Sequence, residues 1–320
     1  MLRLGLSPRM KALVTGGAGF IGSHVVDRLL KDGYQVTVVD NLSGGNLKNI
    51  AHLKDDKRFQ FVKGDLKDEK LMEKLVNGND AVFHLAAHAD IRKSLADHKA
   101  DLENNLVGTC NLLEGMVKHG VKDLVFASTS AIYGEATVMP TPEDYMPKQT
   151  SLYGASKLAC EAFAQGYTKL APINFWAFRF ANVVGERCRR GVVWDLVHKL
   201  RSNPKELEIL GDGKQSKEYF DVGDCVEGIM TGYKKAPGPV NAFNLGHPTQ
   251  TSVDEVADIV IDEMGLTNVK RHYTGGVGGW IGDNPRVLLS IKKMQQLGWN
   301  PKVSSDEGIR KTIRWTLANA

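Results

Sequence analysis

The stretch TGGAGFIG, residues 15–22, follows an apolar and β-branched run at Lys11–Thr15 and opens an amphipathic segment. Each of its three spaced glycines has a physical use here. Gly16 permits a tight turn, Gly19 lets the backbone approach a pyrophosphate, and Gly22 lets helix and strand pack closely. The helix N-terminus then faces the anion. Because a plain strand-to-helix turn needs only one of these glycines, the stretch predicts a dinucleotide-binding loop.

Asp40 supports this interpretation and selects the cofactor. It ends the next β-branched run, Gln35–Asp40, 18 residues after Gly22. A carboxylate at this place accepts hydrogen bonds from the adenosine ribose hydroxyls and repels a 2′-phosphate. The pattern therefore predicts NAD rather than NADP.

The first half of the chain alternates short apolar runs with amphipathic segments, which is typical of a parallel sheet covered by helices. Glycines at 33 and 120 fit the left-handed position that closes a helix. We expect strands at 11–15, 35–40, 59–64, 81–86, 124–128 and 175–180, and helices at 21–31, 69–76, 101–118 and 153–170. The predicted fold class is α/β, a Rossmann-type doubly wound parallel sheet.

Beyond residue 181 this alternation gives way to segments punctuated by glycine and proline. We expect a helix at 192–201, a turn at 211–213, a strand and helix at 218–233, and a final helix at 305–318. The pattern predicts an NAD-binding domain over residues 10–180, rejoined by parts of 218–247. Residues 181–320 are predicted to form a smaller, mixed α/β substrate domain, with the functional site in the cleft between the two.

Composition excludes several classes of protein. The net charge of +4, from 41 basic and 37 acidic side chains, is too small and too evenly spread for a nucleic-acid partner. No apolar run approaches the roughly 18 residues of a membrane span. The four cysteines form no Cys-x-x-Cys pair, which argues against zinc or a disulfide framework and favours a reducing cytoplasm. Met10 is a candidate natural start, with residues 1–9 as an extension.

A second constellation places a phenol and an ammonium group four residues apart, at Tyr153 and Lys157, and therefore on one helix face. A nearby cation favours phenolate, so we expect the pKa of Tyr153 to lie nearer neutrality than its usual value of about 10. The hydroxyls of Ser128, Thr129 and Ser130 end a predicted strand upstream, where one of them would share a substrate oxygen with Tyr153. Alone, a Tyr/Lys pair is more often a surface feature.

Together these residues resemble the extended short-chain dehydrogenase/reductases and, among them, the nucleotide-sugar 4-epimerases of the UDP-glucose/UDP-galactose type. The resemblance covers nearly the whole chain, from Lys11 to about Trp299. Its further motifs are Gly64-Asp65-Leu66, His84-Leu85-Ala86-Ala87, Asn104-Asn105, residues 128–134 (STSAIYG), Arg179-Phe180-Ala181-Asn182 and residues 211–215 (GDGKQ).

The resemblance implies a role for each matching position. The cofactor contacts would be Gly16, Gly19, Phe20, Ile21, Gly22, Asp40, Asn41, Asp65, Leu66, Leu85, Ala86, Ala87, Asn105, Tyr153, Lys157 and Ala181. The catalytic residues would be Thr129, Tyr153 and Lys157. The nucleotide-sugar contacts would be Thr129, Asn182, Arg189, Asp195, Leu196, Lys217 and Asp283. The family also implies a homodimer through the helices at 101–118 and 153–170.

Departures from the family pattern bear on the reaction. Ala131 stands where dehydratases and decarboxylases of the family commonly carry a glutamate, and a methyl group moves no proton, so epimerisation is favoured. Lys217 replaces a common arginine and loses its bidentate fork. Trp280 likewise replaces a commonly basic phosphate contact. Val287 stands where relatives carry a side chain that limits the size of the substrate pocket. A role in core packing explains a valine at this position equally well.

The basic run at 186–190 has two interpretations. Arg187, Arg189 and Arg190 either supply phosphate contacts, which would also suit a sugar carboxylate, or form a solvated loop. His84 and His88 are four residues apart, but at a strand end, so ordinary packing or a cofactor contact is favoured over a metal site.

The leading hypothesis is an NAD-dependent nucleotide-sugar 4-epimerase that acts on a UDP-hexose through a transient 4-keto sugar. The alternatives are a UDP-glucuronate or UDP-N-acetylglucosamine 4-epimerase, or a related oxidoreductase or dehydratase. An NAD-binding sensor is the alternative outside the enzymes. A sensor has no need of Thr129, Tyr153 and Lys157 together.

Overall fold

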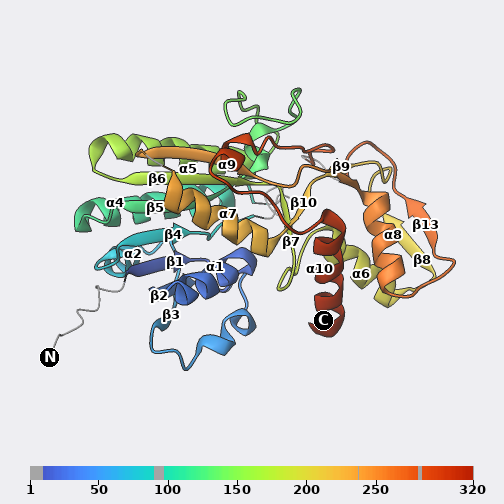
Figure 1. The fold of residues 1–320 in the computed structure, drawn as a ribbon, viewed down its shortest axis with the longest axis horizontal. Coiled ribbons are helices and arrows are strands. Elements are labelled where there is room, and N and C mark those ends of the chain that lie inside the picture. The colour runs from blue at the N-terminus through green and yellow to red at the C-terminus, as the bar shows by residue number, and fades with distance from the viewer. Residues whose placement is uncertain (1–9, 90–96, 237, 280–282, 320) are drawn as a thin grey trace.

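A computed structural model describes residues 10–89, 97–236, 238–279 and 283–319. Its centre is a seven-stranded parallel sheet in the order β11-β6-β5-β4-β1-β2-β3 (Figure 1). The strands are β1 (Lys11–Thr15), β2 (Gln35–Asp40), β3 (Phe59–Lys63), β4 (Ala81–His84), β5 (Asp123–Thr129), β6 (Asn174–Phe180) and β11 (Val240–Leu245). The predicted doubly wound Rossmann sheet is confirmed. The seventh strand comes from the second half of the chain and pairs with β6.

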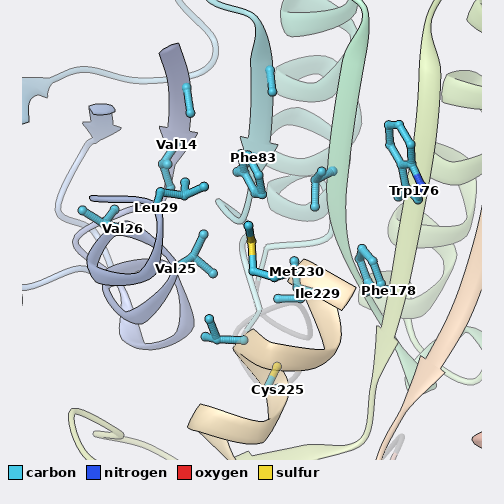
Figure 2. Close-up of a cluster of buried hydrophobic side chains, with 14 of the residues drawn as sticks. Val14, Val25, Val26, Leu29, Phe83, Trp176, Phe178, Cys225, Ile229 and Met230 are labelled. Carbon is cyan, nitrogen blue, oxygen red and sulfur yellow. The ribbon is translucent and has the colours of Figure 1, made fainter. Parts of the chain in front are cut away.

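Helices cover both faces of the sheet (Figure 1). One face is covered by α1 (Phe20–Lys31) and α7 (Val222–Lys235), and the other by α2 (Glu69–Val76), α4 (Gly108–His119) and α5 (Leu152–Leu170). Figure 2 shows the first interface, where Leu29 of α1 and Met230 of α7 meet Phe83 of β4. These three side chains have no exposed surface, and each such burial contributes about 1.5–3 kcal/mol.

Glycine ends two helices as the sequence predicts. After α1, Gly33 has φ +92° and its N–H donates to the Leu30 carbonyl, while Tyr34 N–H donates to that of Leu29. Gly120 has φ +68° after α4. The bonds from Gly33 and Tyr34 satisfy the last carbonyl groups of α1. They require a left-handed backbone at the residue after the helix, which glycine adopts more easily than other residues.

The predicted helix at 101–118 begins differently from the expectation. Residues Leu102–Val107 form a π-helix, η3, which leads into α4. This wider turn faces the loop after β4, where the Asn105 side chain bonds both backbone groups of His88. The periodicity of apolar residues predicts a helix here. It does not predict the wider turn of a π-helix. π-bulges are frequently found at functional sites.

The helices α6 (Val192–Ser202), α8 (Val253–Glu263) and α10 (Ser305–Asn319) gather to one side of the sheet together with β8 (Glu206–Ile209) and β13 (Lys270–Tyr273) (Figure 1). These helices share a core with Leu207, Ile209 and Tyr219. The other elements are β7 (Asn182–Val184), β9 (Ser216–Lys217), β10 (Tyr219–Asp221), β12 (Thr251–Ser252), α9 (Lys292–Gln296), and the short 3₁₀ turns η1 (Leu47–Asn49), η2 (Ala51–Leu53) and η4 (Ser130–Tyr133). Among the described residues, no helix is long and apolar enough to cross a bilayer.

Candidate active site

The strand order reverses between β1 and β4, which pair with each other at the centre of the sheet. In such sheets ligands bind in the crevice at this point. Backbone here is packed too closely for side chains: a Cβ on Gly16 would lie 2.6 Å from the Ala86 nitrogen, and one on Gly22 would lie 2.1 Å from the Gly16 oxygen. The glycine loop is therefore a bare backbone cradle, which fits a dinucleotide pyrophosphate.

A cleft of about 610 Å³ opens over this cradle. Most of the predicted cofactor residues line it. They are Gly16, Gly19, Phe20, Ile21, Gly22, Asp40, Asn41, Asp65, Leu66, Leu85, Ala86, Ala87 and Tyr153.

Other residues of the cleft wall escape the sequence analysis. They come from the segment after β2: Ser43, Gly44, Gly45 and Asn46 in the loop and Asn49 in η1. His88, for which the sequence leaves packing or a cofactor contact open, follows β4 and also lines the cleft. The Ser/Gly/Asn composition at 43–46 indicates a loop. This signal could have suggested that the backbone after Asp40 lines the cleft.

Asp40 binds the glycine loop as well as facing the cleft. Its carboxylate accepts hydrogen bonds from the backbone N–H groups of Ala18, at 3.1 Å, and Leu42, at 2.8 Å. Burial raises the pKa of Asp40, and these two hydrogen bonds oppose the shift. Each oxygen keeps an acceptor direction for a ribose hydroxyl.

Tyr153 lines the cleft, and Thr129 lies beside it. Thr129 ends β5 and Tyr153 lies in the first turn of α5, where the Thr129 side chain acts on the phenol and opposes the rise of its pKa. Ser151 caps this helix by accepting a hydrogen bond from Gly154 N–H at 3.1 Å, which fixes where α5 begins. The structure therefore brings together two of the three predicted catalytic residues.

The prediction of a lowered Tyr153 pKa is wrong for this structure. Burial raises the pKa of Tyr153 to about 12, and the Thr129 side chain only partly opposes this shift. The predicted cation, Lys157, has its Nζ 3.9 Å from the centre of the Phe126 ring, and burial lowers the pKa of this amine to about 8. Sequence spacing places both groups on one helix face but does not reveal how deeply the protein buries them.

The described residues that line the cleft do not include Asn105, Lys157 or Ala181. Asn105 accepts a hydrogen bond from His88 N–H at 2.7 Å and donates one to the Ser156 hydroxyl at 2.9 Å. It thus ties the loop after β4 to the helix that carries Tyr153. A cofactor contact by these three residues stays a prediction.

The three arginines of the basic run line the cleft, Arg187 and Arg189 half-buried and Arg190 exposed. Arg187 forms an ion pair with Asp27 at 2.8 Å, and Arg189 donates to the Asn49 side chain at 2.8 Å. The His24 ring nitrogen lies 3.0 Å from the Glu186 carbonyl oxygen. The loop at 186–190 is thereby attached to α1 and η1 on the cofactor side of the cleft.

The predicted substrate contacts lie farther out, in the C-terminal part. Lys217 of β9 and Asp283 form an ion pair, and Asn182 of β7 donates to the Glu218 carbonyl at 3.1 Å. Asp195 lies in the first turn of α6, whereas the Leu196 side chain is buried in the core of this region. Val287 packs against the Ile132, Tyr133 and Leu289 cluster, as the core-packing interpretation has it. Trp280 and residues 1–9 lie outside the described residues.

The two histidines near the cleft have protein partners. Thr15 Oγ1 lies 2.7 Å from one ring nitrogen of His84 and Thr109 Oγ1 lies 2.9 Å from the other. Burial lowers the pKa of His84 well below its usual value. His88 is 2.9 Å from the Asp101 carboxylate. Within the described ranges, no group of three His, Cys, Asp or Glu side chains could hold a metal ion.

Comparisons with known proteins agree with this geometry. Residues 12–246 match the model of the NAD dependent epimerase/dehydratase family. A putative UDP-glucose 4-epimerase of Methanocaldococcus jannaschii is 36% identical over 320 residues, covering 96% of this chain and 98% of that one.

Solved structures give the same result. The UDP-glucose 4-epimerase of Thermotoga maritima with UDP-glucose has a TM-score of 0.87 at 35% identity, covering 97% of this chain and 99% of that one. The Thermus thermophilus UDP-glucose 4-epimerase in complex with NAD has a TM-score of 0.85 at 33% identity, covering 97% and 100%. The resemblance seen in the sequence motifs is confirmed, and this chain belongs to the NAD-dependent epimerase/dehydratase family.

Proposed function

We propose that this protein is an NAD-dependent nucleotide-sugar 4-epimerase that acts on a UDP-hexose of the UDP-glucose/UDP-galactose type. The observation that carries this proposal is the pairing of Thr129 with Tyr153, which lines a cleft built on a glycine cradle. Two hydroxyl groups beside a dinucleotide site suit the oxidation and reduction of one alcohol carbon.

The cofactor is NAD, and the cradle and Asp40 fit it. A bound NAD would supply a reversible hydride acceptor for C4 of the sugar, with the hydride returned to the opposite face. Because no reducing equivalent leaves in this cycle, the cofactor is expected to stay bound between turnovers. The arginine loop at 186–190, attached to Asp27 and Asn49, supports such retention.

The residues of the chain handle the proton of the 4-hydroxyl group. Tyr153, as phenolate, takes this proton when the 4-keto sugar forms and gives it back when the sugar is reduced. Thr129 donates a hydrogen bond to the developing keto oxygen. Lys157, one turn beyond Tyr153 on α5, supplies the positive charge that favours phenolate. Burial raises the pKa of Tyr153 to about 12, so the reaction needs such a charge beside the phenol.

The nucleotide-sugar is held by the C-terminal part in this proposal. Lys217 and Asn182 would reach the diphosphate and sugar, and Asp283 holds Lys217 in place through their ion pair. Arg189, Asp195 and Leu196 complete the predicted contacts. Only the backbone of Leu196 is available for this, because its side chain is buried.

Epimerisation is preferred to dehydration or decarboxylation because of Ala131. This residue follows Thr129 by two positions, and its N–H donates to the Thr129 hydroxyl oxygen at 3.1 Å. It sits at the catalytic hydroxyl but offers only a methyl group. An added acid or base is needed for those other reactions.

Three further features of the protein are proposed. We assign residues 10–180, together with parts of 218–247, to the NAD-binding domain and the rest of 181–320 to the substrate domain. The protein is expected to be cytoplasmic, since all four cysteines are free thiols, and to have no nucleic-acid partner. It is expected to form a homodimer, since apolar side chains are exposed on η3, α4 and α5: Leu102, Val107, Val117, Leu152, Phe163 and Leu170.

Substitution of Tyr153 tests the proposal. Tyr153→Phe removes the hydroxyl group and should lower kcat by about 10²–10⁴-fold while bound NAD and thermal stability stay unchanged. An NAD-binding sensor would show no sugar conversion in the wild-type protein either. Full activity of the phenylalanine variant would overturn the mechanism.

A further inference from the structure

A buried ion pair lies behind the catalytic pair. Glu161 is on α5, one turn after Lys157 and two turns after Tyr153, so the three side chains share one face of the helix. Its partner is Arg179 on the neighbouring strand β6. Only 1% of Glu161 and 7% of Arg179 are exposed.

The geometry of this pair is bidentate. Arg179 Nε donates to Glu161 Oε1 at 3.1 Å, and Nη2 donates to Oε2 at 2.7 Å. The Ser128 hydroxyl also donates to Glu161 Oε1. Since Ser128 directly precedes Thr129, the carboxylate binds the end of β5 at the residue next to the catalytic hydroxyl.

The other side of Arg179 continues the network. Its Nη1 donates to the Tyr133 hydroxyl at 2.8 Å and to the Glu143 carbonyl at 2.7 Å. Tyr133 in turn donates to the Asn244 side chain on β11 at 2.7 Å. The pair therefore joins α5 to β5, β6, η4 and β11 through buried hydrogen bonds.

Stability alone gives little reason for this arrangement. Taking two charges out of water costs free energy, and well-packed apolar residues are often as stabilising as a buried ion pair. A bidentate pair does fix relative orientation. Here the pair fixes the orientation of the helix that carries Tyr153 relative to the strand end that carries Thr129.

The carboxylate also affects the charge of Lys157. Burial lowers the pKa of Lys157, and Glu161 and Cys160, both on α5, oppose that shift. From β4, His84 faces the amine, but burial lowers the pKa of His84 so far that it is neutral. Phe126 of β5 and Tyr153 of α5 are uncharged near neutral pH. Arg179 lies beyond Glu161, whose carboxylate it neutralises.

We propose that Glu161 and Arg179 are positioning residues for the reaction: their ion pair fixes the strand end that carries Thr129 against the helix that carries Tyr153. This inference rests on the proposed epimerase function.

The test compares two variants with the wild-type holoenzyme. Glu161→Gln keeps the shape and removes the charge. The double variant Glu161→Leu/Arg179→Met replaces the pair by apolar groups of similar size and serves if the first fails to fold. For each, kcat and KM for the sugar nucleotide are measured against pH, together with bound NAD and the melting temperature. Arg271→Ala, which removes the exposed ion pair with Asp258, is the matched control.

The expected result is specific to positioning. The KM and the bound NAD stay within about twofold, kcat falls about tenfold or more because small misplacements are costly, and the pH at which kcat declines on the alkaline side moves lower. A folded variant with wild-type kcat and an unchanged pH profile would overturn the inference. If wild-type protein and Tyr153→Phe are equally active or equally inactive, the proposed function itself fails, which is a distinguishable result.

Discussion

Thr129 and Tyr153 interact across the boundary between a strand and a helix, although they are 24 positions apart in the chain. Thr129 is the last residue of β5, and Tyr153 is in the first turn of α5. The sheet places the first hydroxyl group and the Ser151 cap places the second. A proton acceptor and a hydrogen-bond donor thus converge on one point of the cleft.

Removal of the threonine hydroxyl should slow catalysis without loss of binding. We expect Thr129→Val to lower kcat by about 10²–10³-fold, since one oriented donor to a developing oxyanion contributes about 2.7–4 kcal/mol. The KM should change little. Ser130→Ala, the neighbouring hydroxyl in η4, is the matched control and should retain activity. Equal losses in the two variants would contradict the assignment of Thr129.

Removal of the Lys157 charge should stabilise the ligand-free protein. The pKa of Lys157 is lowered to about 8, from an unfolded value of about 10.4. Below pH 8 the amine is charged in both states, and its burial opposes folding. Between pH 8 and 10.4 the unfolded chain binds more protons, so the free energy of unfolding of the wild-type protein rises with pH.

Lys157→Met should therefore raise the free energy of unfolding at pH 7 by up to about 3 kcal/mol, and this gain should shrink as the pH rises from 8 to 10. Chemical denaturation at several pH values measures it. Epimerase activity should be lost at the same time. A less stable methionine variant at pH 7 would show that the buried charge does not carry this cost.

Detachment of the arginine loop should weaken cofactor retention. Arg187 lines the cleft and pairs with Asp27 of α1, so Arg187→Ala removes one attachment of the loop. We expect about tenfold weaker NAD binding, or 1.4 kcal/mol, and less NAD in protein recovered from gel filtration. With excess NAD, kcat should recover. The Arg271→Ala control should keep its NAD; retention by both variants would argue against the loop's role.

Disruption of the exposed apolar face should produce a monomer. Phe163 on α5 is 48% exposed and lies among the apolar residues of η3, α4 and α5, so Phe163→Asp should halve the mass measured by light scattering at micromolar concentration. Val138→Asp, an equally exposed apolar residue on a loop, should leave the dimer intact. A wild-type protein that is already monomeric would contradict the proposed homodimer.

The sequence predicts those parts of the fold whose cause is local. The strands and helices of the first half follow from periodicity, and Gly33 and Gly120 follow from the backbone that a helix end requires. The nucleotide cleft is predictable because Gly16, Gly22 and Asp40 each have one clear use there. For the C-terminal part, the expectation of a substrate domain comes from the motifs shared with the family.

Features that depend on packing were not predictable. The raised pKa of Tyr153 comes from burial by residues distant in the sequence. The π-helix depends on the fit between Asn105 and His88, and the arginine loop gains its place from Asp27 and Asn49. Charge and spacing in the sequence do not specify such partners.

Epimerase activity can be measured by incubating the purified protein separately with UDP-glucose, UDP-N-acetylglucosamine and UDP-glucuronate, without added cofactor, and resolving the products by chromatography and NMR. We expect conversion of UDP-glucose to UDP-galactose by NAD that is already bound. Conversion of another of these sugars would correct the substrate but keep the reaction. If none is converted, even with NAD supplied, or if NADH accumulates in proportion to product, the protein is not an epimerase of these UDP-sugars.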